Sequence, residues 1–174
     1  MLGTHEDVAI ETWKRRLAQS KASRRTISAI HPVLEEWVRR QHGRLSYRAT
    51  QILTGYGCFG DYLFRIGREQ SANCWHCREG IEDSAQHTLE VCQAWVAERE
   101  ILVEQVGQDL SLRAILPRML ESPDAWHAVL HFCEEVMSQK EAAEREREAS
   151  PDAPPNRRRR SGHRRRHYHL HAPS

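Results

Sequence analysis

Apolar residues recur at the three- to four-residue spacing of amphipathic helices over most of the chain before residue 149. Glycine, proline and serine interrupt this pattern at places typical of helix ends. The pattern predicts helices over 4–19, 32–40, 46–54, 59–66, 95–106, 111–119 and 123–148. The last of these has a core-facing stripe, whereas its end from 140 to 148 is almost entirely charged and is expected to be a solvated extension. No stretch alternates as a strand would, so the pattern predicts an all-α protein.

The composition indicates how large the hydrophobic core can be and in which cell compartments the chain is expected. The 174 residues are 39% hydrophobic, and their mean hydropathy is −0.73. We therefore expect one modest core with some disordered chain. No apolar run approaches the roughly 18 residues of a membrane span, and no signal-peptide pattern opens the sequence. We expect a nuclear or cytoplasmic protein that is not secreted and does not contact a membrane.

The most informative motif is a C-x2-C-x9-H-x4-C array formed by Cys74, Cys77, His87 and Cys92. Three thiolates and one imidazole complete a tetrahedral set of the kind found in structural zinc sites. Cys74 and Cys77 can reach one metal from a tight turn, and Ser84 can cap a short helix that carries His87. His87 and Cys92 can meet if this helix unwinds after His87. His76 is a competing nitrogen ligand, but it lies inside the turn and should point away.

A closed set of four ligands predicts one structural Zn²⁺ and no catalysis, because catalytic zinc keeps one position open for water. Glu82, Asp83 and Glu90 are candidate general bases for a zinc hydrolase, but we interpret them as solvated charges near the turn. The two remaining cysteines, Cys58 and Cys133, are interpreted as small buried hydrophobic residues, since unoxidised thiols suit a reducing compartment.

The net charge of +2 conceals a basic tail. From residue 149 onward the chain has seven of its 26 basic residues and one of its 24 acidic residues. Proline residues followed by Arg/His-rich low-complexity sequence predict disorder there. We divide the chain into an N-terminal helical segment (1–72), a CCHC zinc knuckle (73–95), C-terminal helices (96–148) and a disordered tail (149–174). The tail can coat phosphate or direct nuclear import, or it can be translated sequence without a selected role.

One hypothesis is that the chain binds RNA or DNA. Zinc knuckles present aromatic side chains on which unpaired bases stack, which makes Trp75 a candidate platform and Arg78 a candidate phosphate contact. Packing of Trp75 against neighbouring helices is the alternative. Further arginines are candidate phosphate contacts: Arg39, Arg40, Arg44 and Arg48, with Arg65 and Arg68 as weaker ones.

A second hypothesis is a protein-interaction or scaffold module. The helix over 123–148 could dock on a polymerase or on a second copy of the chain. This hypothesis needs an exposed apolar stripe along Trp126, Val129 and Phe132. Burial of that stripe inside the monomer would remove its surface.

Ordered motifs in the chain resemble the C-terminal region of the Pol polyprotein of insect non-LTR retrotransposons, of the type-1 element that inserts into ribosomal DNA. They are LSYRATQILTGYGCFGDYLFRIG (45–67), CWHC (74–77), EDSAQHTLEVC (82–92) and DAWHAVLHFCEEVMSQKE (124–141). The resemblance implies a parent protein with an endonuclease, a reverse transcriptase and this Cys/His region after them. It also implies that Cys74, Cys77, His87 and Cys92 are the zinc ligands. The Arg/His tail departs from the family.

We interpret the chain as a fragment of such a polyprotein, or as a reading frame cut from a decayed copy. Two-metal phosphoryl transfer needs clustered carboxylates, which a reverse transcriptase supplies partly as adjacent aspartates. This sequence has no Asp-Asp pair. Glu35-Glu36 and Glu134-Glu135 lie on predicted helices, where neighbours point in different directions. RNA-directed DNA polymerase or endonuclease activity would therefore belong to the parent, which is also an expected partner.

Overall fold

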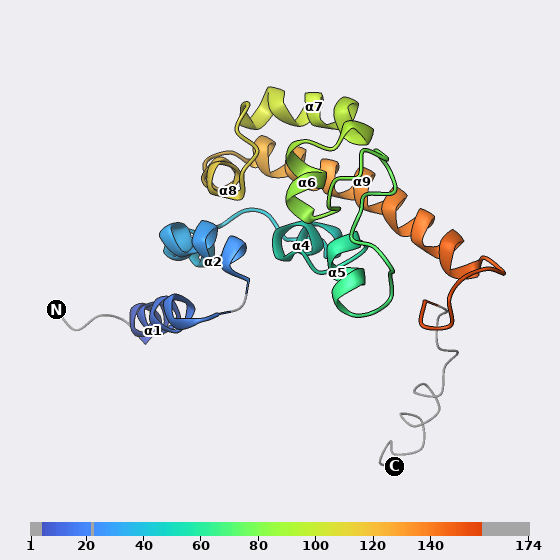
Figure 1. The fold of residues 1–174 in the computed structure, drawn as a ribbon. Helices are drawn as coiled ribbons and strands as arrows, with labels where there is room; N and C mark the ends of the chain where they lie inside the picture. Colours follow the sequence, from blue (N-terminus) through green and yellow to red (C-terminus); the bar gives the residue numbers. More distant parts are fainter. Residues whose placement is uncertain (1–4, 22, 158–174) are drawn as a thin grey trace, which may run out of the picture.

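The computed structural model describes residues 5–21 and 23–157, and in these residues it is helical (Figure 1). The described part contains no strand and only an isolated antiparallel bridge, between Asn73 and Glu82. The prediction of an all-α protein is confirmed. The elements in chain order are α1 (His5–Gln19), α2 (Arg24–Ile30), the 3₁₀ turn η1 (His31–Val33), α3 (Leu34–Arg39), α4 (Tyr47–Thr54), α5 (Gly60–Arg65), α6 (Ala85–Glu90), η2 (Gln93–Trp95), α7 (Val96–Val106), α8 (Leu112–Glu121) and α9 (Pro123–Ala149).

The long helix α9 organises the core, because α4, α7 and α8 all pack against it (Figure 1). It begins as the sequence predicts: the Ser122 hydroxyl accepts a hydrogen bond from the Ala125 amide at 3.3 Å, and Pro123 occupies the first turn. Trp126, Val129 and Phe132 are buried under the neighbouring helices. Burial of these side chains favours folding by about 2 kcal/mol each, so this stripe is core and not an exposed docking face.

The charged end of α9 differs from the prediction of a solvated extension. Lys140 has no exposed surface, and Glu144 is also buried. Both continue the stripe of Cys133 and Met137 at helical spacing, so they face the interior of the molecule. Their charges are matched by partners from distant segments, which periodicity alone does not reveal.

At the other end of the chain, α1 packs weakly on α3 and η1. The sequence pattern predicts an apolar face of this helix that includes Ile10 and Trp13. This prediction is only partly correct, because Ile10 is buried whereas Trp13 is 53% exposed. The segment before Pro32, for which the sequence pattern predicts no helix, forms α2. The Arg25 guanidinium donates to the Ile52 carbonyl at 3.0 Å, which ties α2 to α4.

Residues 150–157 fold back after α9, and we call this segment the strap. Ala153 and Arg157 are buried, and Asn156 donates a hydrogen bond to the Gly67 carbonyl. The predicted disordered tail therefore starts too early, at residue 149, because a buried arginine with carboxylate partners orders the next eight positions. The rest of the predicted tail, 158–174, lies outside the described residues.

Among the helices that the structure describes, we find none with the length and apolarity needed to cross a bilayer.

The loop before α4 requires a glycine at position 43. Its φ of +78° lies in the left-handed region, and an added Cβ would lie 2.2 Å from the Trp126 ring. The same ring packs on Trp37 with centroids 5.4 Å apart. Gly43 therefore lets the backbone pass directly over the central tryptophan of the core.

We expect Gly43→Ala to lower the free energy of unfolding by about 2–4 kcal/mol, because it adds a left-handed alanine and overpacks the Trp126 site. Gly55→Ala is the matched control, since Gly55 has a φ of +75° but no atom within 4 Å of an added Cβ. It should cost about 1 kcal/mol, because only the left-handed conformation penalises the alanine. Urea unfolding followed by circular dichroism measures both, and equal losses would contradict the packing argument.

Candidate metal centre

A short hairpin presents the first two cysteines. The Cys74 amide donates to the Ile81 carbonyl at 2.7 Å, and the Asp83 amide donates to the Ala72 carbonyl at 2.8 Å. Arg78 and Gly80, with φ of 56° and 70°, reverse the chain between these bonds. The C-x2-C pair therefore lies in a turn whose ends are fixed by backbone hydrogen bonds.

The second pair of candidate ligands comes from α6 and the residues after it. The Ser84 hydroxyl accepts from the His87 amide at 3.0 Å, so Ser84 caps α6 as the sequence predicts. The helix then opens: the Cys92 amide reaches back five residues to the His87 carbonyl at 2.8 Å. The expected unwinding after His87 is confirmed, and it brings Cys92 round to the side of the imidazole.

The ligand atoms of Cys74, Cys77, His87 and Cys92 all lie within 4.8 Å of one another. The Sγ atoms of Cys74 and Cys92 are 3.9 Å apart, and Cys77 Sγ is 3.5 Å from His87 Nε2. A tetrahedral ion with metal–sulfur bonds of about 2.3 Å and metal–nitrogen bonds of about 2.0–2.1 Å requires separations of about 3.8 Å and 3.6 Å. The donor spacing therefore fits a metal ion bound by all four residues.

His76, the competing ligand, is turned away from the cluster. Its ring packs on Trp95 with centroids 5.0 Å apart. The Nδ1 atom of His87 is buried and has no hydrogen-bond partner in the described residues, so Nε2 is the nitrogen directed at the sulfurs. The structure thus agrees with the preference for His87.

The cysteines of the cluster differ in their electrostatics. The Cys92 thiol hydrogen-bonds to Cys74, which lowers the pKa of the Cys74 thiol and raises that of Cys92. The thiolate is the form of cysteine that binds metal, and of the three cysteines Cys74 is the one whose pKa is lowered. Arg99 from α7 donates to the carbonyls of Cys92 at 2.7 Å and Leu89 at 3.0 Å. This guanidinium places a positive charge beside the backbone that carries Cys92.

One acidic residue of the knuckle does not have the environment that the sequence predicts. Glu82 is exposed as expected, but Asp83 is buried. The Asp83 carboxylate accepts from Lys140 Nζ at 2.7 and 2.9 Å and from the Gly60 amide at 2.9 Å. The prediction that Asp83 is solvated is wrong, because its charge is neutralised by a buried lysine of α9. These partners occupy the carboxylate that a hydrolase mechanism would need as a base.

Sequence reasoning missed Lys140 and Arg99 as supports of the site. Lys140 does carry a signal, because it continues the apolar stripe of α9 after Cys133 and Met137, a position where a lysine needs a buried partner. Arg99 carries none, since it lies on a helix rich in exposed charges and acts only on backbone carbonyls.

The candidate nucleic-acid contacts of the knuckle are accessible. Trp75 is 51% exposed, and Arg78 is exposed beside it. Both line a hollow of about 430 Å³, which is completed by Ser71, Asn73, Cys74 and Gly80. The Arg147 guanidinium of α9 lies 5.5 Å from the centroid of the Trp75 ring. An aromatic surface and two cations therefore lie together at the edge of the metal centre.

Two of the four candidate arginines between positions 39 and 48 are already paired with carboxylates. Arg39 forms ion pairs with Asp7 and Glu35, and Arg48 lies 2.7 Å from Glu134 and 2.8 Å from Glu141. Their role in phosphate binding stays a prediction, and it would require exchange of these carboxylates for phosphate.

Arg40 and Arg44 have different surroundings. The Arg40 guanidinium lies 4.7 Å from the Trp37 ring centroid and 5.1 Å from that of Trp126. Arg44 is exposed, and its carbonyl accepts from Trp126 Nε1 at 3.4 Å. Phosphate binding by either side chain also stays a prediction, and Arg44 is the more accessible of the two.

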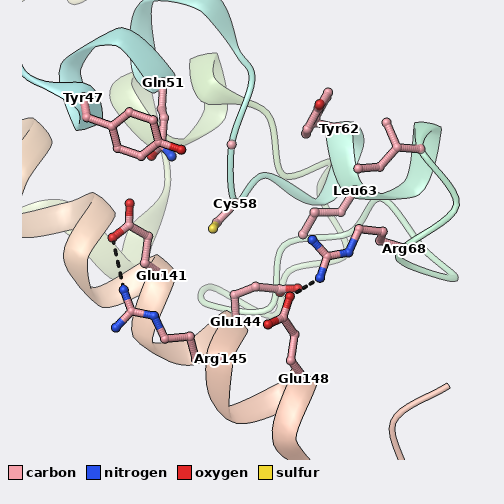
Figure 2. Close-up of a pocket in the computed structure, with 12 residues that line it drawn as sticks. Tyr47, Gln51, Cys58, Tyr62, Leu63, Arg68, Glu141, Glu144, Arg145 and Glu148 are labelled. Atoms are coloured by element: carbon pink, nitrogen blue, oxygen red, sulfur yellow. Dashed lines mark hydrogen bonds and ion pairs between the residues drawn. The ribbon is translucent and has the colours of Figure 1, made fainter. Parts of the chain in front are cut away.

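A second hollow, of about 470 Å³, lies between α4, α5 and α9 (Figure 2). Three glutamates of α9 line it, but each has an arginine partner: Glu141 pairs with Arg48, Glu148 with Arg68, and Glu144 with Arg157. Burial raises the pKa of the Cys58 thiol in this hollow to about 11, so it stays protonated. The hollow thus has matched charges and no activated nucleophile at Cys58. Cys133, the other remaining cysteine, is buried as predicted.

The fold and the cluster define a helical module with a closed Cys₃His set that can hold a metal ion. The chain is 26% identical over 131 residues to a curated relative, the "Retrovirus-related Pol polyprotein from type-1 retrotransposable element R1 4" of Nasonia vitripennis. The match covers 72% of this chain and 32% of the relative, so the chain spans about a third of that protein's length. The resemblance inferred from the sequence motifs is thereby confirmed. No family model and no solved structure matches the chain.

We expect the purified chain to contain one equivalent of metal, and Cys77→Ser to lose it, because three remaining donors leave the site open. Cys58→Ser is the matched control, since Cys58 lies outside the cluster. Elemental analysis gives the metal content, and melting with and without a chelator gives its contribution, on the order of 10 kcal/mol in small metal-dependent folds. Equal metal content in the two variants would exclude Cys77 as a ligand.

We expect Lys140→Met to destabilise the protein by about 3–5 kcal/mol, because it leaves the Asp83 carboxylate buried without a cation. The double variant Asp83→Asn/Lys140→Met should cost less, since neither charge remains. Arg118→Met, which breaks an exposed ion pair with Glu121, should cost less than about 1 kcal/mol. Denaturant unfolding measures all three. A double variant at least as unstable as Lys140→Met alone would show that the two charges do not interact.

Proposed function

We propose that the chain is a non-catalytic module that binds single-stranded RNA or DNA through the surface around Trp75 and Arg78. The single observation that supports this most is the exposed indole beside an exposed arginine in a hollow at the metal centre. Bases stack on such aromatic platforms whatever their sequence, and arginine pairs with the phosphates between them.

In this proposal the metal is Zn²⁺ and its role is structural. Three thiolates with one imidazole are a typical zinc set, and all four tetrahedral positions are taken by protein. The ion would hold the hairpin 73–82 against α6, and so hold Trp75 and Arg78 in fixed positions. It would leave no position for an activated water.

The parent protein in this proposal is a Pol polyprotein with RNA-directed DNA polymerase activity, as the similarity to the type-1 element relative suggests. The module would then bind the element RNA or its DNA target while the polymerase acts elsewhere in the polyprotein, in the nucleus or the cytoplasm. The absence of an Asp-Asp pair from this sequence supports a binding role over a catalytic one.

A scaffold module that docks through α9 is the alternative, but its expected stripe is not available. Trp126, Val129 and Phe132 are all buried within the monomer. An interaction with the polymerase part of the parent would have to use another surface, so nucleic-acid binding is the function that we favour.

We expect the chain to bind labelled single-stranded RNA with an affinity that falls as salt rises, because phosphate contacts release counterions. Trp75→Ala/Arg78→Ala should weaken binding at least about tenfold, since one stacked base is worth about 1–3 kcal/mol. It should also make the logarithmic salt slope shallower by about one.

The matched control is Trp13→Ala/Arg118→Ala, which removes the same two side-chain types from exposed positions on α1 and α8. Fluorescence anisotropy across a salt series measures all three proteins. Salt-independent binding, or an equal loss in the control, would count against the proposal.

A further inference from the structure

The strap ends in a buried cluster of charges next to the metal centre. Arg157 pairs with Glu69, which precedes the hairpin, and lies 2.8 Å from Glu144 of α9. Arg147, one turn further along α9, lies 2.8 Å from the same Glu144 oxygen and 3.9 Å from Glu69. Two carboxylates and two guanidinium groups therefore balance one another in a region from which water is largely excluded.

Arg147 links this cluster to the proposed nucleic-acid surface. Its guanidinium lies 5.5 Å from the centroid of the Trp75 ring while its Nη2 atom binds Glu144. Its side chain is mostly buried, whereas the indole is half exposed. Arg147 therefore supports the indole from the protein side, through a cation–π contact, and leaves part of the ring open to solvent.

Arg157 determines how far Arg147 can reach. Without Arg157, Arg147 alone would have to neutralise both Glu69 and Glu144. A buried carboxylate without a cation is costly in free energy. Arg147 is the nearest cation, and its Nε atom is already 3.9 Å from Glu69. The guanidinium would then move toward Glu69 and away from the Trp75 ring.

We propose that the strap completes the nucleic-acid site: Arg157 is a positioning residue that neutralises Glu69 and Glu144 and thereby holds Arg147 against Trp75. A rigid indole loses less conformational freedom when a base stacks on it, so this arrangement preorganises the platform for single-stranded RNA. This inference rests on the proposed function, since the platform that it describes is the same surface.

The test is a double-variant cycle in the full chain, with Arg157→Gln and Trp75→Ala made separately and together. We expect Arg157→Gln to weaken single-stranded RNA binding by about three- to tenfold and to have no further effect in the Trp75→Ala background. Effects that multiply in the double variant would overturn the inference, because Arg157 would then act independently of Trp75. Arg157→Lys should recover part of the binding, since it restores one cation without the two-carboxylate bridge.

Arg145→Gln is the matched control, because it removes the same charge from α9 at a side chain that is 70% exposed. An equal loss of binding in this control would mean that only net charge matters, which also overturns the inference. Metal content and far-UV circular dichroism should be unchanged in Arg157→Gln. Nuclear magnetic relaxation of the Trp75 indole N–H should report greater motion in that variant, and an unchanged indole would contradict the positioning role.

These outcomes separate the two proposals. If the unaltered chain binds RNA but Arg157→Gln binds equally well, the proposed function stands and this inference fails. If the unaltered chain does not bind RNA, the proposed function fails, and with it the claim that the strap completes a nucleic-acid site. The indole measurement then still decides whether Arg157 positions Arg147.

Discussion

The buried ion pair between Asp83 and Lys140 is the constraint on which the arrangement of this molecule depends. Asp83 lies directly between the metal-binding hairpin and α6, and Lys140 lies in the middle of the longest helix. The same carboxylate accepts the Gly60 amide at the start of α5. One buried charge therefore sets the position of the hairpin, of α6 and of α5 relative to α9. Such a pair contributes little net free energy, but it strongly disfavours arrangements in which either charge loses its partner.

The metal centre and this ion pair have complementary roles. The four ligands can fix the hairpin and α6 to each other, but they come from 19 consecutive residues and cannot orient that unit on the rest of the fold. Lys140 supplies the missing orientation, and the Glu69, Glu144, Arg147 and Arg157 cluster adds a second attachment from the strap. These contacts together place the exposed face of the hairpin, with Trp75 and Arg78, on the rest of the fold.

Features that depend on local sequence could be predicted, and features that depend on distant partners could not. Ser84, Ser122 and the ligand spacing act within a few residues, so the capped helices and the Cys₃His cluster follow from the sequence alone. The partners of Asp83, Lys140 and Arg157 did not follow, because each charge is neutralised by a residue between 13 and 88 positions away. The exposure of Trp13 was also missed, since periodicity identifies an apolar face but not whether a neighbour covers it.

The distance along the chain between Asp83 and Lys140 has a consequence for synthesis on the ribosome. At about 5–20 residues per second, α9 leaves the ribosome several seconds after the metal ligands do. The hairpin and α6 can load their ion during that interval, while the Asp83 carboxylate is still hydrated. The hairpin and α6 are then available as a template before the helix that covers them has been made, and the contacts of the strap form after those of α9.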